Sequence, residues 1–247
     1  MGSTLLRSLL HDVDLLCLDA GNTVVFLDHA RLAGLCARRG FVTSAAALAR
    51  AEGETKIAFE CGVELDVPWS EAHPPKVRGW GKTMATLLTR AGLASERIPE
   101  LLDEFWAAHC ALNLWSIVPT GLLAALNRVR KAGVPVAIVS NSEGMLENLF
   151  DRLGILDGMD LVLDSGIVGI EKPDPGIFRM ALERFGVASE RAFHLGDNFA
   201  TDVLGARAAG VRVALVDPYG HLRGRHTDVP RVAGAVSVAH AIADARE

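Results

Sequence analysis

The stretch "LLCLDAGNTVVF" (residues 15–26) decides the fold, because an apolar run in it ends on a single carboxylate, Asp19. Residues 13–19 have the continuous apolar character of a strand that is buried on both faces. The small residues after Asp19 predict a turn. In open parallel α/β sheets, sites form beyond the carboxyl ends of the strands. The stretch therefore predicts a first core strand that carries an acid to a functional site.

The second half of the chain alternates between short apolar runs and amphipathic segments. Such alternation predicts a parallel sheet with right-handed crossovers. Thr120 is expected to cap the first helix of this half, and Asp174 with Pro175 is expected to begin the third. The expected strands are 134–140, 160–165, 191–197 and 211–217, and the expected helices are 120–133, 144–154, 174–186 and 200–210. The fold class is therefore α/β, with a doubly wound parallel sheet.

Between the first strand and this second half, the pattern is helical. Helical periodicity covers 29–39, 44–60, 80–91 and 96–113, and a polar, proline-bearing loop covers 61–79. We predict an α-helical domain over 28–115, inserted into a core domain made of 1–27 and 116–247. The tail from residue 218 to residue 247 is expected to add a short strand and a helix.

Composition and charge exclude several classes of protein. The chain has 247 residues and is 50% hydrophobic, enough for one core domain with an insert. A formal net charge of -5 provides no basic field to attract nucleic acid. The chain has no apolar run of ~18 residues and no signal peptide, so we expect a cytoplasmic protein that does not bind a membrane. Monomer and homodimer both stay open.

The four cysteines show no metal-ligand spacing. They are widely separated and include no C-x-x-C pair, so they are expected to be reduced and mostly buried thiols. These residues are Cys17, Cys36, Cys61 and Cys110.

Polar side chains stand at or just after several expected strand ends. They are Asp19, Ser140, Lys172 and Asp197, with Asp202 following shortly after. Together they supply a nucleophile, a hydroxyl donor, a cation and further carboxylates, which phosphoryl transfer needs for in-line attack and charge neutralisation. Carboxylate oxygens with one lysine also favour Mg²⁺ over zinc or copper.

Four segments in this order resemble the motifs of the haloacid dehalogenase (HAD) superfamily. They are "DAGNT" (19–23), "VSN" (139–141), "EKPDPGIF" (171–178) and "GDNFATD" (196–202). The resemblance covers essentially the whole chain, and the predicted helical insert stands where that family has its type-1 cap. It implies a HAD-like core with an inserted helical cap, and a hydrolase that acts on a small phosphorylated metabolite.

The resemblance also implies a role for each matching residue. Asp19 would be the nucleophile that forms an aspartyl-phosphate, and Thr23 would occupy the terminal hydroxyl position of its motif. Ser140 and Asn141 would bind the phosphoryl group, and Lys172 would balance the charge of nucleophile and phosphate.

The resemblance further implies a Mg²⁺ site. Asp19, Asp197 and the backbone carbonyl of Gly21 would be ligands, and Asp202 would be a further ligand or an outer-shell partner.

Gly21 departs from the family pattern. Family phosphatases commonly have a second aspartate two residues after the nucleophile, where it serves as general acid and then base. Glycine keeps the backbone carbonyl but removes the proton donor, whose contribution is typically ~10²–10⁴-fold. The chain is then a phosphatase for leaving groups that need little protonation, or one that borrows a donor such as Asp28 or His29.

Three other readings stay open. A 2-haloacid dehalogenase would need no proton donor, but "GDNFATD" keeps the acidic form of the fourth motif rather than the dehalogenase form. A phosphonatase-like enzyme would use a cap lysine, for which Lys56, Lys76 and Lys82 are candidates by position. A catalytically weak protein could bind a phosphorylated ligand or a partner.

The segment 68–80 is the most suggestive part of the predicted cap. It carries Trp69, His73, Lys76, Arg78 and Trp80, which would contact a substrate or, equally, belong to a loop held by the two tryptophans. His194, inside an expected strand, is interpreted as a buried histidine with its hydrogen bonds satisfied rather than as a ligand.

Overall fold

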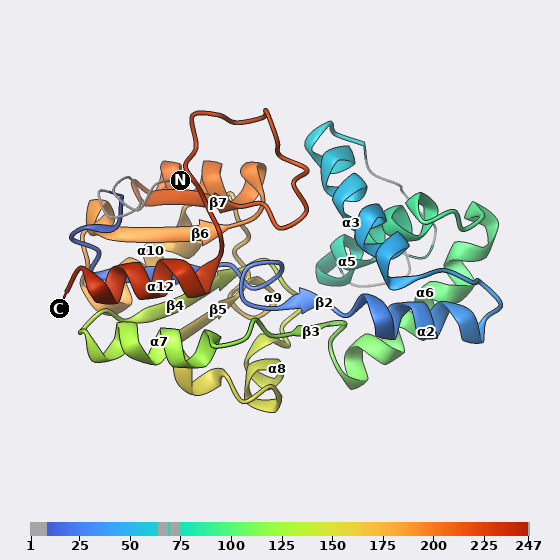
Figure 1. Ribbon diagram of the computed structural model, residues 1–247, viewed down its shortest axis with the longest axis horizontal. Helices are drawn as coiled ribbons and strands as arrows, with labels where there is room; N and C mark the ends of the chain where they lie inside the picture. Colours follow the sequence, from blue (N-terminus) through green and yellow to red (C-terminus); the bar gives the residue numbers. More distant parts are fainter. Residues whose placement is uncertain (1–8, 64–68, 70–74, 247) are drawn as a thin grey trace. The chain divides into compact units, whose positions relative to one another are not determined.

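The computed structural model describes residues 9–63, 69 and 75–246, although nothing is described of the side chains of residues 75 and 76. The chain divides into two compact units (Figure 1). We call them the core unit (Met1–Phe26, Ile117–Pro218 and Gly224–Glu247) and the helical unit (Leu27–Ser116 and Tyr219–Arg223).

The core unit is built on a parallel sheet of six strands. Its order is β5-β4-β1-β6-β7-β8, with β1 in the interior of the sheet between β4 and β6. The strands are β1 (Leu15–Leu18), β4 (Val136–Ser140), β5 (Leu161–Asp164), β6 (Ala192–Gly196), β7 (Arg212–Val216) and β8 (Arg231–Val232). Every residue of β1, β4 and β6 is buried, as expected of apolar strands that are covered on both faces.

Helices lie on both faces of this sheet (Figure 1). They are α7 (Leu122–Lys131), α8 (Leu146–Arg152), α9 (Ser165–Val168), α10 (Gly176–Phe185), α11 (Leu204–Ala208) and α12 (Ala235–Asp244). Short 3₁₀ segments cover Leu156–Gly158 and Ser189–Arg191, and a π-helical turn covers Phe199–Val203. The α/β class and the parallel sheet predicted from the sequence are therefore confirmed.

Several predicted helix boundaries were wrong. Thr120 does not cap α7, because Gly121 takes the N-cap position with a left-handed φ of 80°. Pro175 rather than Asp174 is the N-cap of α10, although Asp174 Oδ1 still accepts the Gly176 N–H at 2.7 Å. The helix predicted over 200–210 is divided between the π-helical turn and α11.

The helical unit contains α2 (His29–Arg38), α3 (Ala45–Glu60), α5 (Pro75–Arg90), a 3₁₀ turn (Ser95–Arg97) and α6 (Ile98–Ala111). Asp28 and Ser44 cap α2 and α3 through their side chains. Helix α5 begins at Pro75 rather than at residue 80, because proline is well suited to the first turn of a helix. Strands β2 (Phe26–Leu27) and β3 (Trp115–Ile117) pair with each other where the chain passes between the units.

The two tryptophans of segment 68–80 lie in the core of the helical unit. Trp69 and Trp80 are buried with ring centroids 5.6 Å apart, and Trp69 Nε1 donates to Asp103 Oδ1. Arg78 is exposed. His73 and the side chain of Lys76 lie outside the described residues. The tryptophans therefore serve packing, which is one of the two interpretations of this segment.

The four cysteines differ in exposure. Cys17 and Cys36 are buried, whereas Cys61 and Cys110 are exposed, so the prediction of mostly buried thiols holds for half of them. Burial raises the pKa of Cys17 to about 12, which keeps this residue of β1 a neutral thiol. Among the described residues, no helix is long and apolar enough to cross a membrane.

We expect Leu102→Ala to destabilise the helical unit by about 2–5 kcal/mol, because Leu102 is fully buried in its core and truncation leaves a cavity. Denaturant unfolding followed by tryptophan fluorescence measures this change. Val42→Ala is the control, since Val42 is 88% exposed and its truncation should change stability by less than about 0.5 kcal/mol. Equal effects of the two substitutions would contradict the assigned core.

Candidate active site

Three buried acids meet at the carboxyl ends of adjacent strands. Asp19 follows β1, Asp197 follows β6, and Asp202 lies in the π-helical turn just beyond. Each offers a carboxylate oxygen, and these oxygens lie within 4.8 Å of one another. The site follows from topology, because β1 and β6 are neighbours in a parallel sheet and end at the same edge.

Lys172 brings a positive charge into this group. Its Nζ lies 2.7 Å from Asp19 Oδ1 and 2.5 Å from Asp202 Oδ1, and the side chain is buried. Burial alone would lower the pKa of Lys172, but the two carboxylates outweigh it and hold the pKa above its ordinary value. Lys172 is therefore a charged ammonium at neutral pH.

The Asp202 carboxylate accepts four hydrogen bonds, two on each oxygen. Its Oδ1 accepts from Lys172 Nζ and from His194 Nε2 at 3.0 Å. Its Oδ2 accepts the backbone N–H groups of Asp197 at 3.1 Å and Asn198 at 2.9 Å. Burial would raise the pKa of Asp202, but Lys172 and His194 outweigh it and hold that pKa well below the usual range. Asp202 thus fixes the loop that carries Asp197.

His194 was predicted to be a buried histidine with its hydrogen bonds satisfied. It is fully buried in β6, but the second part of the prediction holds for Nε2 alone, because Nδ1 has no hydrogen-bond partner among the described residues. Because the Asp202 carboxylate is ionised, Nε2 must carry the proton of its hydrogen bond with Asp202. The contact between His194 and Asp202 could not be predicted from the sequence, since it depends on how the strand returns into the π-helical turn.

Gly196 makes room for Asp202. A Cβ at this position would lie 2.2 Å from Asp202 Cγ and 2.4 Å from Asp202 Oδ2, so any side chain here would displace the Asp202 carboxylate. The glycine of "GDNFATD" is therefore required by the close approach of the carboxylate to the strand.

The turn after Asp19 is closed by its own backbone. The Ala20 carbonyl accepts N–H groups of Val24 and Val25 at 2.9 and 3.0 Å, and Asn22 takes a left-handed φ of 56°. Gly21 is not among the residues with positive φ. Thr23 is buried, and within the described part of the chain its Oγ1 has no hydrogen-bond partner.

Ser140 and Asn141 lie at the carboxyl end of β4, the strand that neighbours β1. Ser140 is buried at the end of β4, which pairs with β1. The Asn141 side chain contacts the backbone of Lys172 twice, donating from Nδ2 to the carbonyl at 2.9 Å and accepting the N–H on Oδ1 at 2.8 Å. Asn141 therefore fixes the segment from which Lys172 reaches the acids.

Asp28 and His29, the candidate replacements for the missing proton donor, make side-chain contacts within the helical unit. Asp28 accepts the Arg31 N–H at 2.9 Å, and His29 Nε2 lies 2.7 Å from Glu52 Oε2. Burial raises the pKa of Glu52, but His29, the charge of Lys56 and the Tyr219 hydroxyl together hold it below its ordinary value. Lys82, like Lys56, belongs to the helical unit.

The charge and donor set of the site fit a divalent cation. Three buried carboxylates and one ammonium leave two formal negative charges, and burying uncompensated charge costs several kcal/mol. The donors are hard carboxylate oxygens, which suit Mg²⁺.

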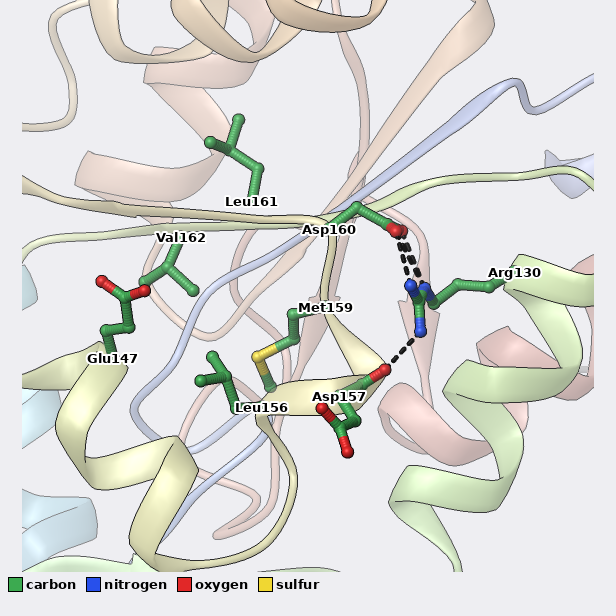
Figure 2. Close-up of a pocket in the computed structure, with 8 residues that line it drawn as sticks. All are labelled: Arg130, Glu147, Leu156, Asp157, Met159, Asp160, Leu161 and Val162. Atoms are coloured by element: carbon green, nitrogen blue, oxygen red, sulfur yellow. Dashed lines mark hydrogen bonds and ion pairs between the residues drawn. The ribbon is translucent and has the colours of Figure 1, made fainter.

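A separate hollow of about 440 Å³ lies at the other end of the sheet. Figure 2 shows Arg130 bound to Asp160, which immediately precedes β5 at its amino end. None of the site residues described above lines it. It is therefore distinct from the carboxylate site, which lies at the carboxyl ends of the strands.

Comparison with known proteins agrees with this architecture. A sequence model described as haloacid dehalogenase-like hydrolase matches residues 13–210. A phosphoserine phosphatase of Thermus thermophilus is 42% identical over 133 residues, which are 53% of this chain and 51% of the relative. The chain spans about half the length of the curated relatives it matches.

Two solved structures share the fold over nearly the whole chain. A magnesium-bound HAD-hydrolase of Bacillus subtilis, YfnB, has a TM-score of 0.64 at 16% identity, covering 93% of this chain and 98% of its own. A 2-haloacid dehalogenase of Pseudomonas syringae has a TM-score of 0.57 at 21% identity, covering 94% and 99%. The family match includes all four motifs and most of the chain, so this protein belongs to the haloacid dehalogenase-like hydrolases.

Proposed function

We propose that the protein is a Mg²⁺-dependent phosphatase that hydrolyses a small phosphomonoester through an aspartyl-phosphate on Asp19. The observation that carries the proposal is the cluster of Asp19, Asp197 and Asp202 within 4.8 Å, with Lys172 bonded to two of them. Relatives that are themselves phosphatases, such as the phosphoserine phosphatase of Thermus thermophilus, add support. In this proposal, residues 28–115 act as the cap and supply the contacts that select the substrate.

Asp19, the backbone carbonyl of Gly21 and Asp197 would hold Mg²⁺, with Asp202 as the partner that fixes the loop of Asp197. Bound there, the ion would offset the repulsion between the nucleophilic carboxylate and an anionic phosphate. The four donors on Asp202 favour the supporting role for it over direct ligation.

The chain's own residues then divide the reaction between them. Asp19 attacks phosphorus, the bond from phosphorus to the leaving oxygen breaks, and the electron pair leaves with that oxygen. Ser140, Asn141 and the buried hydroxyl of Thr23 would bind the phosphoryl group, and Lys172 would balance its charge. Water then attacks the aspartyl-phosphate, which releases inorganic phosphate and restores Asp19.

Dehalogenation is the second candidate, and Gly21 is the observation that favours it, because a halide leaves without a proton. The buried acids Asp197 and Asp202 oppose it, since attack on carbon by Asp19 needs no divalent ion. Halide release from 2-chloropropionate in the absence of Mg²⁺, with no phosphatase activity, would decide for dehalogenation.

Asp19→Asn should reduce phosphatase turnover by at least about 10³-fold, because it removes the nucleophile. Removal of Mg²⁺ with EDTA should have a similar effect that added Mg²⁺ reverses. Release of phosphate from 4-nitrophenyl phosphate measures both. Asp228→Asn is the control, since Asp228 is exposed and paired with Arg207. Turnover that survives in Asp19→Asn would refute the covalent mechanism.

Gly21→Asp tests the missing proton donor. Wild-type protein should hydrolyse an aryl phosphate far faster than an alkyl phosphate, and the substitution should raise alkyl turnover by about 10²-fold or more with little change in aryl turnover. Gly21→Asn, which has similar size but no acid, should not raise it. Equal wild-type rates on the two substrates would show that another residue supplies the proton.

Gly196→Ala should lower kcat/KM by at least about 10²-fold, because the added Cβ must displace the Asp202 carboxylate and with it the loop of Asp197. Calorimetric titration with Mg²⁺ should show weaker binding as well. The matched control is Gly34→Ala, a helical glycine with open space around it. Unchanged Mg²⁺ affinity in Gly196→Ala would contradict the anchoring role of Asp202.

A further inference from the structure

Asp164 is a buried carboxylate at the carboxyl end of β5 that takes no part in the reaction described above. It is 3% exposed and accepts three backbone N–H groups. Oδ1 accepts from Gly144 at 3.0 Å and from Gly166 at 2.9 Å, and Oδ2 accepts from Leu146 at 3.1 Å. Gly144 belongs to the loop that follows β4, and Leu146 is the first residue of α8, which that loop leads into. One side chain of β5 thus fixes the loop that leaves the neighbouring strand.

The residues next to Asp164 hold the same loop. Ser165 Oγ accepts the Ser142 N–H at 3.1 Å and lies 3.3 Å from the Ser142 carbonyl. A Cβ on Gly166 would lie 2.5 Å from the Gly144 nitrogen and 2.8 Å from the Ser142 carbonyl oxygen. The loop over 142–144 therefore rests directly on the backbone of Gly166, where only glycine leaves space.

This loop begins at the residues assigned to the phosphoryl group. Ser140 ends β4 and Asn141 is the first residue of the loop. Asn141 also fixes the backbone of Lys172 by two hydrogen bonds. The loop is thus held at its start by Lys172 and a few residues later by Asp164, with Ser140 and Asn141 leading into it.

We infer that Asp164 is a positioning residue, which sets the Ser140–Asn141 turn and, through Asn141, the segment of Lys172. The inference rests on the proposed function, since it gives this turn the task of binding the phosphoryl group. The physical reason is that three N–H groups bound to one buried carboxylate restrict the conformation of the loop, and removal of the carboxylate leaves all three unsatisfied. A displacement of the turn by about 1 Å is enough to cost ~10²-fold in rate.

Asp160 offers a matched control on the same strand. It precedes β5 at the amino end, where Oδ2 accepts the Val136 N–H at 2.9 Å and the carboxylate binds Arg130 (Figure 2). Like Asp164, it joins β5 to the segment of β4, but at the edge of the sheet away from the catalytic acids. A purely structural role for Asp164 predicts that both substitutions behave alike.

The experiment compares Asp164→Ala with Asp160→Ala in the full chain. For Asp164→Ala we expect kcat/KM to fall by about 10- to 100-fold, by the same factor for an aryl and an alkyl phosphate, because the phosphoryl group is common to both. Affinity for inorganic phosphate in the presence of Mg²⁺ should fall as well, while affinity for Mg²⁺ alone is unchanged. Asp160→Ala should keep kcat/KM within about twofold even where its melting temperature falls equally. Loss of kcat/KM in proportion to stability in both variants would overturn the inference.

Hydrogen–deuterium exchange separates this inference from the proposed function, because it needs no turnover. Asp164→Ala should speed exchange in residues 141–146 and at Lys172, and Asp160→Ala should not. Unchanged protection of these residues would overturn the inference, whereas wild-type protein without phosphatase activity would overturn the proposed function alone.

If Asp164→Ala fails to fold, Asp164→Asn serves in its place. It keeps the acceptor for Gly144 and Gly166, loses the one for Leu146, and should give an intermediate effect on both measurements.

Discussion

The buried ammonium of Lys172, shared between Asp19 and Asp202, is the interaction on which the rest of the site depends. Burial of three carboxylates near one another is strongly unfavourable without positive charge to compensate it. Lys172 supplies part of that charge, and the two formal negative charges that remain match a divalent cation. The same contacts join three distant parts of the chain, the end of β1, the segment before α10 and the π-helical turn. The contacts that compensate the buried charge therefore also hold these three segments together.

Two charged groups of the site, Asp202 and Lys172, are held by groups that do not themselves react. His194 and two backbone N–H groups hold Asp202, and the absence of a side chain at Gly196 makes room for it. Asn141 holds the backbone of Lys172. Such supports limit the freedom of the reacting groups before a substrate arrives, which is the condition for electrostatic stabilisation of a transition state. The π-helical turn fits this pattern, because irregular helical turns of this kind occur frequently at functional sites.

The sequence predicted the parts of this structure that local pattern controls. Apolar runs that end on polar residues identified β1, β4 and β6, and with them Asp19, Ser140 and Asp197. It did not predict the supports, because they depend on register and on close approach between distant segments. Cys17 of β1 pairs with both Ala137 and His194, for example, and no local pattern reveals that arrangement. Asp164 is the last residue of β5, but its role could not be predicted because its partners are backbone groups of another segment. Likewise, the N-cap of α7 fell on Gly121, since a turn that needs left-handed φ outweighed the capping preference of threonine.

Gly21 is not required by the backbone conformation of its turn. The turn after Asp19 has its left-handed position at Asn22, and Gly21 has no positive φ, so the backbone there does not require glycine. Glycine in such a position loses more conformational entropy on folding than any other residue, which is a cost without a structural return. The backbone carbonyl that the resemblance assigns to the metal is present in every amino acid, so metal binding does not require glycine either. What glycine changes is the chemistry, because the position after Ala20 then lacks a proton donor for the leaving group. In the proposed mechanism, Gly21 therefore suits a substrate whose leaving group either needs no proton or receives one from another residue.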